Sequence, residues 1–261
     1  MKRISLLFLS ALALSLLGGC SNAPKEYVGI VSAMNNEIAL LLQETSIEKT
    51  ETIAGVTYHA GTLKGKNVVI CPSGIGKIRA ASGVTTLLNR YHITKTIFTG
   101  IAGGVRDEES VLDEVVATRV CQHDYGRLDN EGFTWEGGDP GTGGEPGEYY
   151  ACDPTLVSKA YDAAVAVLGK EHVWKGTIAC GDQFVASEAY VDYLEKEHDA
   201  YACDMESAAI AVVCQSHGVP FAILRALSDK ADGHARETYQ DFGDVAAENS
   251  NRILLNMLDT F

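Results

Sequence analysis

Positively charged residues are scarce in this chain of 261 residues. Lys and Arg number 21 against 35 Asp and Glu, which gives a formal net charge of −14. The sequence contains no basic patch that could follow a phosphate backbone, which argues against nucleic acid as a partner. The acidity also disfavours tight binding to anionic lipid headgroups. We therefore expect neither a nucleic-acid complex nor an electrostatic attachment to a membrane surface.

Closely spaced cysteine pairs are absent as well. The chain has seven cysteines but no CxxC spacing, so zinc ligation has no support and we expect neither a metal nor a cofactor. Cys71, Cys180 and Cys214 stand in apolar runs and are predicted to be small buried residues. Cys121 and Cys152 bracket a loop and form the most favourable pair if an exported chain makes a disulfide.

Long apolar runs are missing except at the beginning of the chain. There, Lys2 and Arg3 precede an apolar run over residues 4–17, and the small residues Gly18 and Gly19 follow. A basic start, an apolar middle and small residues before a cleavage point are typical of a secretory signal. The alternative is an uncleaved membrane anchor.

The end of this segment resembles the lipoprotein box of bacteria. In such proteins the cysteine, here Cys20, is lipidated and becomes the new N-terminus. The resemblance implies a signal peptide over residues 1–19, a lipidated tether over 20–26 and a folded domain over 27–261. The chain is then expected to be exported and attached by its lipid to a bacterial membrane, on the periplasmic or cell-surface side.

Strand and helix patterns alternate through the rest of the chain. Mostly apolar strands are predicted at residues 27–33, 67–71, 96–99, 115–120, 173–180 and 221–227, and helices at 78–88, 154–168, 187–196 and 242–258. Asp153 is placed to cap the second of these helices, with Pro154 at its first position. The alternation predicts a three-layer α/β domain with a mainly parallel central sheet.

Three further local predictions concern connecting segments. Residues 56–65 are predicted to form a hairpin with Gly61 near its turn. Asn35 or Asn36 is predicted to cap a short helix that begins at Ile38. Residues 126–150 are rich in glycine and acidic residues and are predicted to form a long surface loop.

Three carboxylates lie where α/β proteins place their ligands. Glu37 follows the strand 27–33, Asp229 follows the strand 221–227, and Glu206 opens a helix pattern. Ligand sites in open α/β sheets lie at the carboxyl ends of strands. Each carboxylate also has a structural alternative, because acidic residues stabilise helix N-termini and serve in ordinary turns.

Six motifs occur in order along the chain. They are GIVSAMNNE at 29–37, SGIGK at 73–77, TGIAGG at 99–104, GDQFV at 181–185, DMES at 204–207 and RALSD at 225–229. Together they resemble the bacterial 5′-methylthioadenosine/S-adenosylhomocysteine nucleosidases, a family of the nucleoside phosphorylase/hydrolase superfamily. The resemblance implies a single domain with a mixed sheet, a homodimer, and hydrolysis of the bond between adenine and ribose in a purine nucleoside.

The resemblance also implies a role for individual residues. Glu37 is expected to activate the attacking water, Asp229 to protonate adenine N7, and Glu206 to accept hydrogen bonds from the ribose hydroxyls. The other expected contacts are Met34 and Met205 on the sugar, Phe184 and the Val185 backbone on adenine, and Ala102, Gly103 and Ser228 along the wall. Such chemistry needs an acid on the base side and a carboxylate on the water side, as in glycosidases.

The sequence departs from the family at Ile101, where many relatives have Ser, and at Asp204, where Glu is commoner. The 126–150 segment also looks longer than usual, which leaves the preferred 5′ substituent open. One rival function is a nucleoside phosphorylase, but the run Ile97–Gly100 lacks the arginine that such enzymes use for phosphate. The other rival is a lipid-anchored nucleoside-binding protein without catalysis, which would not need Glu37 and Asp229 together.

Overall fold

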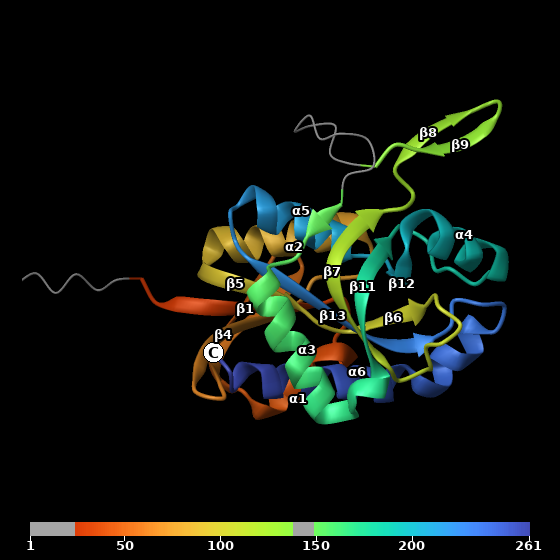
Figure 1. The fold of residues 1–261 in the computed structure, drawn as a ribbon. Coiled ribbons are helices and arrows are strands. Elements are labelled where there is room, and N and C mark those ends of the chain that lie inside the picture. Colours follow the sequence, from red (N-terminus) through yellow and green to blue (C-terminus); the bar gives the residue numbers. More distant parts are fainter. Residues whose placement is uncertain (1–23, 138–148) are drawn as a thin grey trace, which may run out of the picture.

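The computed structural model describes residues 24–137 and 149–261 (Figure 1). Residues 1–19, which carry the predicted signal peptide, and Cys20, the predicted lipidation site, lie outside the described residues. The described chain begins just before the first strand, Glu26–Ser32. The predicted 27–261 domain is therefore described except for residues 138–148.

A mixed sheet of eleven strands forms the centre of the described residues. The strands are β1 Glu26–Ser32, β2 Ser46–Ile53, β3 Val56–Leu63, β4 Lys66–Pro72, β5 His92–Phe98, β6 Ile101–Gly104, β7 Glu114–Gln122, β10 Tyr150–Ala151, β11 Val173–Cys180, β12 Ala200–Asp204 and β13 Phe221–Asp229. Their spatial order is β10-β7-β11-β12-β6-β13-β5-β1-β4-β3-β2. Parallel pairs include β4–β1, β1–β5 and β5–β13, whereas β2–β3 and β3–β4 at one edge are antiparallel.

Strand β13 pairs with three different strands along its length. Its residues 221–223 pair with β5, residues 224–226 with β7, and residues 226–229 with β6. Because β6 pairs with β12, β12 with β11 and β11 with β7, these strands close into a ring. All nine residues of β13 are buried, as predicted for a strand covered on both faces.

Helices cover both faces of the sheet. They are α1 Ala39–Glu44, α2 Lys77–Arg90, α3 Pro154–Leu168, α4 Glu188–His198, α5 Ser207–Ser216 and α6 Ala235–Leu258, with short 3₁₀ turns η1 Asn36–Ile38 and η2 Lys170–His172. In Figure 1, α2 and α5 lie above the sheet and α1 and α6 below it, and α3 packs on α6. Within the described residues, no helix is long and apolar enough to cross a membrane.

The hairpin predicted at residues 56–65 is wrong. Residues 56–63 form the single strand β3. A turn at residues 54–55 connects β3 to β2, and a turn at residues 64–65 connects it to β4. Gly61 lies inside the strand, where a Cβ atom would be 2.3 Å from the Ser46 carbonyl oxygen. The glycine therefore allows two strands to approach closely and does not make a turn.

The helix caps have mixed outcomes. The Asp153 cap is confirmed, since its carboxylate accepts a hydrogen bond from the Leu156 amide at 2.9 Å. The predicted asparagine cap before Ile38 is wrong, because no side chain caps η1. Instead the Asn36 amide donates to Asp244 on α6 at 2.9 Å, so the residue joins two elements.

The cysteines are buried and form no disulfides within the described residues. All six described cysteines are free and buried, so the burial predicted for Cys71, Cys180 and Cys214 is confirmed. Cys121 and Cys152, named as the most favourable pair if a disulfide forms, are not joined to each other. Both thiols are enclosed in the core, at 0% and 5% exposure.

The predicted 126–150 loop is wrong in its first part, which forms a hairpin of β8 Gly126–Asp129 and β9 Gly132–Trp135. Trp135 anchors the base of this hairpin. Its indole donates to the Gln122 carbonyl at 2.6 Å and packs edge-on against His198, with ring centroids 4.5 Å apart. Neither ring nitrogen of His198 has a hydrogen-bond partner within the described ranges. Burial, together with the nearby His123, lowers the pKa of His198 to about 4.

We predict that this histidine makes the fold less stable in acid. An unfolded His has a pKa of about 6.5, so between about pH 6.5 and pH 4 the unfolded chain binds a proton that folded His198 does not. The free energy of unfolding should therefore fall by about 1–2 kcal/mol from pH 7 to pH 5 because of this residue alone. Urea unfolding of wild type and His198→Phe at both pH values measures the difference.

The matched control is His92→Phe, because His92 is exposed on β5. This substitution should leave the pH dependence of the wild type unchanged. Equal pH dependence in wild type and His198→Phe would contradict the assigned neutral, buried state of His198.

Candidate active site

A cavity of about 500 Å³ lies beside β6 and at the carboxyl ends of β1, β12 and β13. It brings together all the side chains predicted to act on a substrate: Met34, Glu37, Ala102, Gly103, Phe184, Val185, Met205, Glu206, Ser228 and Asp229. These residues come from five separate segments of the sequence. The fold therefore assembles one site from motifs that are far apart along the chain.

Glu37 is held rigidly at the back of the cavity. The amides of Met34 and Ile101 donate to its two carboxylate oxygens at 2.7 and 3.0 Å. Gly100 has φ +147°, and a Cβ atom there would lie 2.3 Å from Glu37 Oε1, so a larger residue would displace the carboxylate. Burial raises the pKa of Glu37, while the positive charge of Arg225 and the backbone donors oppose that rise.

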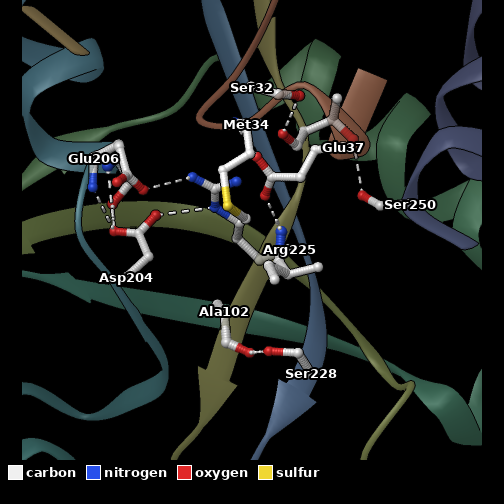
Figure 2. Close-up of polar contacts among 12 residues, drawn as sticks. Ser32, Met34, Glu37, Ala102, Asp204, Glu206, Arg225, Ser228 and Ser250 are labelled. Carbon is white, nitrogen blue, oxygen red and sulfur yellow. Dashed lines mark hydrogen bonds and ion pairs between the residues drawn. The ribbon is translucent and has the colours of Figure 1, made fainter. Parts of the chain in front are cut away.

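Arg225 lies in the middle of β13 and was given no role in the sequence analysis. Its Nε donates to Asp204 at 3.0 Å, and its Nη2 lies 3.5 Å from Glu206. Figure 2 draws these two carboxylates to one side of Arg225 and Glu37 to the other. The guanidinium carbon also lies 3.5 Å from the ring centroid of Phe98. An arginine within an otherwise apolar strand is the signal that could have identified it.

Glu206 is the N-cap residue of α5, and its pKa is raised. The Gly76 amide donates to its Oε1 at 2.8 Å. Burial and then the neighbouring Asp204 raise the pKa of Glu206 to about 7, although Arg225 opposes the shift. At neutral pH this carboxyl can therefore exchange between acceptor and donor roles toward a bound hydroxyl.

Asp229, the last residue of β13, has a different environment. The Ser228 hydroxyl donates to its Oδ2 and the Ala231 amide to its Oδ1, both at 2.8 Å. Burial raises the pKa of Asp229, and no arginine or lysine is among the causes that oppose the shift. Glu37 has the Arg225 charge beside it and Asp229 does not, so the two carboxyls differ in their tendency to carry a proton.

The loop that carries Phe184 and Val185 is fixed to the beginning of α2. The Lys77 amide donates to Asp182 Oδ1 and the Asp182 amide donates to Asp124 Oδ2, both at 2.8 Å. Phe184 remains 52% exposed at the rim of the cavity. A ring exposed at a rim can stack on a flat ligand without large rearrangement.

The sequence analysis missed the contribution of α6. Arg236, Tyr239 and Gln240 line the cavity, but the helix was predicted to begin only at Phe242. It begins at Ala235. The first two turns are mostly polar because they face the cavity and solvent, so the apolar period that marks a helix is absent there.

The geometry defines a class of protein before any comparison is made. An α/β fold places two buried carboxyls of different proton affinity in one cavity, which is the arrangement of general acid–base enzymes. Among the described residues, no group of three or more His, Cys, Asp and Glu side chains is placed to hold a metal ion.

Comparison with known proteins agrees with this class. The model of the family described as the phosphorylase superfamily matches residues 27–259. The 5′-methylthioadenosine/S-adenosylhomocysteine nucleosidase of Anoxybacillus flavithermus is 37% identical over 233 residues, which cover 89% of this chain and 97% of the relative. The enzyme of the same name from Bacillus thuringiensis is 37% identical over 234 residues, covering 89% and 98%.

Solved structures show the same similarity. The nucleosidase of Neisseria meningitidis in complex with methylthio-immucillin-A has a TM-score of 0.82 and 32% identity, covering 91% of this chain and 100% of the other. A futalosine hydrolase of Helicobacter pylori has a TM-score of 0.78 and 29% identity, covering 91% and 99%. This chain belongs to the phosphorylase superfamily and, within it, to the 5′-methylthioadenosine/S-adenosylhomocysteine nucleosidase family.

We predict that Arg225→Met strongly destabilises the fold. The substitution leaves Asp204 and Glu206 buried without a cation, and breaking such a pair costs about 3–5 kcal/mol of unfolding free energy. The loss should be larger at pH 8 than at pH 5, because burial and Asp204 raise the pKa of Glu206 to about 7, so this carboxyl is neutral in acid. Urea unfolding at the two pH values measures both effects.

Arg90→Met is the matched control, since Arg90 forms an exposed ion pair with Glu51 on the surface. Its effect should be much smaller, because solvent screens exposed pairs. An Arg225→Met protein as stable as the Arg90→Met protein would refute the assigned structural role of Arg225.

Proposed function

We propose that this chain hydrolyses the N-glycosidic bond of 5′-methylthioadenosine, S-adenosylhomocysteine or 5′-deoxyadenosine and releases adenine. The observation that carries the proposal is the pair of buried carboxyls Glu37 and Asp229 in one cavity, of which Glu37 has Arg225 beside it. The names of the relatives and the inhibitor bound to the Neisseria meningitidis enzyme support the same substrate class.

Asp229 acts as the general acid. Adenine is a poor leaving group until its ring is protonated, so a proton from Asp229 to N7 lets the base accept the electron pair of the breaking bond. The raised pKa of Asp229 favours the protonated form that the step requires. Ser228 and the Ala231 amide hold the carboxyl in place. Phe184 stacks on adenine, and the backbone of Val185 contacts its edge.

Glu37 acts on the opposite side of the sugar. As the bond breaks, the ribose gains positive charge at C1′, and a water molecule attacks this carbon while Glu37 accepts its proton. Burial raises the pKa of Glu37, and the charge of Arg225 with the backbone donors opposes this rise and so favours the ionised form that this step requires. Glu206 accepts hydrogen bonds from the ribose hydroxyls, and Met34 and Met205 pack against the sugar. The products are adenine and the 5′-substituted ribose.

A phosphorylase is the second candidate and is less well supported. Phosphate would have to enter a cavity that is lined by Glu37, Glu206 and Asp204, and the nearby Arg225 is already bonded to Asp204 at 3.0 Å. Like charges in a poorly hydrated site repel strongly. Water is uncharged and meets no such barrier.

We predict that adenine is released in phosphate-free buffer and that Asp229→Asn and Glu37→Gln each lower kcat at least about 100-fold. General acid–base groups contribute about 10²–10⁴-fold in rate, and both substitutions keep the side-chain shape. Adenine release is followed by chromatography, and binding of 5′-methylthioadenosine by calorimetry on the same samples. Both variants should still bind the nucleoside.

Glu44→Gln on α1 is the matched control, because Glu44 is exposed and lies just after Glu37; it should retain wild-type turnover. Turnover that requires phosphate would establish a phosphorylase instead. Binding without turnover in the wild type would establish a binding protein. Near-wild-type rates in either active-site variant would remove that carboxyl from the mechanism.

We also propose that residues 1–19 are a signal peptide and that Cys20 carries lipid. Support comes from the basic, apolar and small-residue pattern of the sequence. Residues 20–26 would then serve as a tether between the membrane and the domain. An exported enzyme would cleave nucleosides outside the inner membrane, so that the adenine can be salvaged.

We predict that Cys20→Ser abolishes attachment to the membrane. Without the thiol no acyl chain can be added, so the variant should appear as soluble or uncleaved protein after cell fractionation. Mass spectrometry of the N-terminal peptide identifies the lipid in the wild type. Ser21→Ala should be processed normally. Correctly processed Cys20→Ser protein that still partitions with membranes would contradict the proposal.

A homodimer is the assembly that we propose. The two most exposed large apolar side chains of the described surface are Ile78 at 83% and Leu128 at 78%. Ile78 lies on α2 and Leu128 on the β8–β9 hairpin, which projects from the body of the molecule in Figure 1. Exposed apolar side chains on a projecting element are well suited to an interface with a second copy.

A further inference from the structure

One face of α6 borders the cavity. Arg236, Tyr239 and Gln240 have i, i+3, i+4 spacing and therefore project from the same side of the helix. Tyr239 lies between Phe184 and Met34: its ring centroid is 6.3 Å from that of Phe184, and its hydroxyl is 3.9 Å from the Met34 sulfur. These side chains form the rim of the cavity.

This rim is the part of the cavity that remains for the 5′ substituent. In the proposed function, adenine occupies the side of Asp229 and Phe184, and the ribose occupies the side of Glu206 and Glu37. The 5′ group must then extend along Met34 and Tyr239 toward the beginning of α6. Met34 and Tyr239 suit a thioether, but they offer nothing that would recognise a charged tail.

Arg236 does offer such recognition. It is the one cationic side chain among the described residues that line the cavity. It is exposed, and no hydrogen bond or ion pair to it occurs within residues 24–137 and 149–261. In contrast, Arg225 is buried and bonded to Asp204. The guanidinium of Arg236 is therefore free to bind a ligand.

The position of Arg236 in its helix is unfavourable without a ligand. It is the second residue of the 24-residue helix α6, where the positive end of the helix dipole disfavours a cation. Glu237, the next residue, complements the dipole, but Arg236 does not. An anion bound at the rim would interact favourably with both the guanidinium and the helix N-terminus.

We propose that Arg236 is a specificity residue that binds the carboxylate of an amino-acid tail at the 5′ position, as in S-adenosylhomocysteine. This inference rests on the proposed function. The planar guanidinium forms two parallel hydrogen bonds with a carboxylate. The amides of Gln183 and Gln240, which also line the cavity, can accept from the ammonium group of the same tail. A methylthio group would use Met34 and Tyr239 alone.

The test compares kcat/KM for three nucleosides in wild type, Arg236→Gln and Arg236→Lys. The substrates are S-adenosylhomocysteine, 5′-methylthioadenosine, and the aminopropyl thioether of 5′-thioadenosine, which has the ammonium but lacks the carboxylate. In Arg236→Gln, kcat/KM for S-adenosylhomocysteine, divided by kcat/KM for 5′-methylthioadenosine, should fall about 3- to 10-fold. Most of this fall should come from a higher KM for S-adenosylhomocysteine. Arg236→Lys should be intermediate. kcat/KM for the aminopropyl nucleoside, relative to that for 5′-methylthioadenosine, should not fall.

Two controls separate recognition from a structural effect. Arg252→Gln removes an exposed arginine of the same helix that pairs with Glu248, and it should leave all ratios unchanged. Raising NaCl from about 50 to about 500 mM should lower kcat/KM for S-adenosylhomocysteine relative to that for 5′-methylthioadenosine in the wild type, because salt screens an exposed charge. The same change should have no such effect in Arg236→Gln.

The outcomes that overturn the proposal are distinct. An unchanged ratio in Arg236→Gln, an equal fall for all three nucleosides, or an equal fall for the two tailed nucleosides would each show that Arg236 does not bind the carboxylate. Failure of the proposed function would already show in the wild type, as absence of adenine release from every substrate, and would overturn this inference with it.

Discussion

The ion pairs of Arg225 are the constraint on which the rest of the site depends. Three of the carboxyls around this guanidinium, Glu37, Glu206 and Glu114, have pKa values that burial raises and that its charge lowers. The fourth, Asp204, is bonded to it directly. A cavity with so many buried acids is stable only if a cation offsets part of their charge. Since Arg225 is carried by the strand that pairs with β5, β6 and β7, the charge is fixed at the centre of the fold.

Hydrogen bonds connect the polar residues around Arg225 to helix α6. Ser250 of α6 donates to Glu114 at 3.2 Å and shares a hydrogen bond of 2.8 Å with Thr99. Ser32 donates to the Thr99 carbonyl at 2.7 Å (Figure 2). One end of α6 thus borders the cavity while its middle is bonded to the strands that support Glu37. The helix therefore fixes the rim relative to the catalytic carboxyl.

The sequence predicted the parts of the fold that depend on continuous apolar burial. Strand β13 was found because all nine of its residues are buried, and β11 because five of its eight are. Glu37 and Asp229 were found because they lie at the ends of apolar strands. The edge strand β2 was missed because most of its residues are exposed, so it has no apolar pattern. The beginning of α6 was missed for the same reason. The apolar strand around Arg225 marks the residue as unusual, but its partners Asp204 and Glu206 are distant in the sequence and only folding brings them beside it.

The burial of the six described cysteines affects how the chain tolerates its surroundings. Oxidation and thiol exchange proceed through the thiolate, and burial raises the pKa of Cys71, Cys121 and Cys214 to about 12. The folded domain should therefore keep its structure under oxidising and reducing conditions alike, and it needs no disulfide for stability. The vulnerable stage is the newly made chain, in which the same thiols are exposed to one another. Folding that encloses the thiols before they react therefore protects the chain from incorrect disulfides.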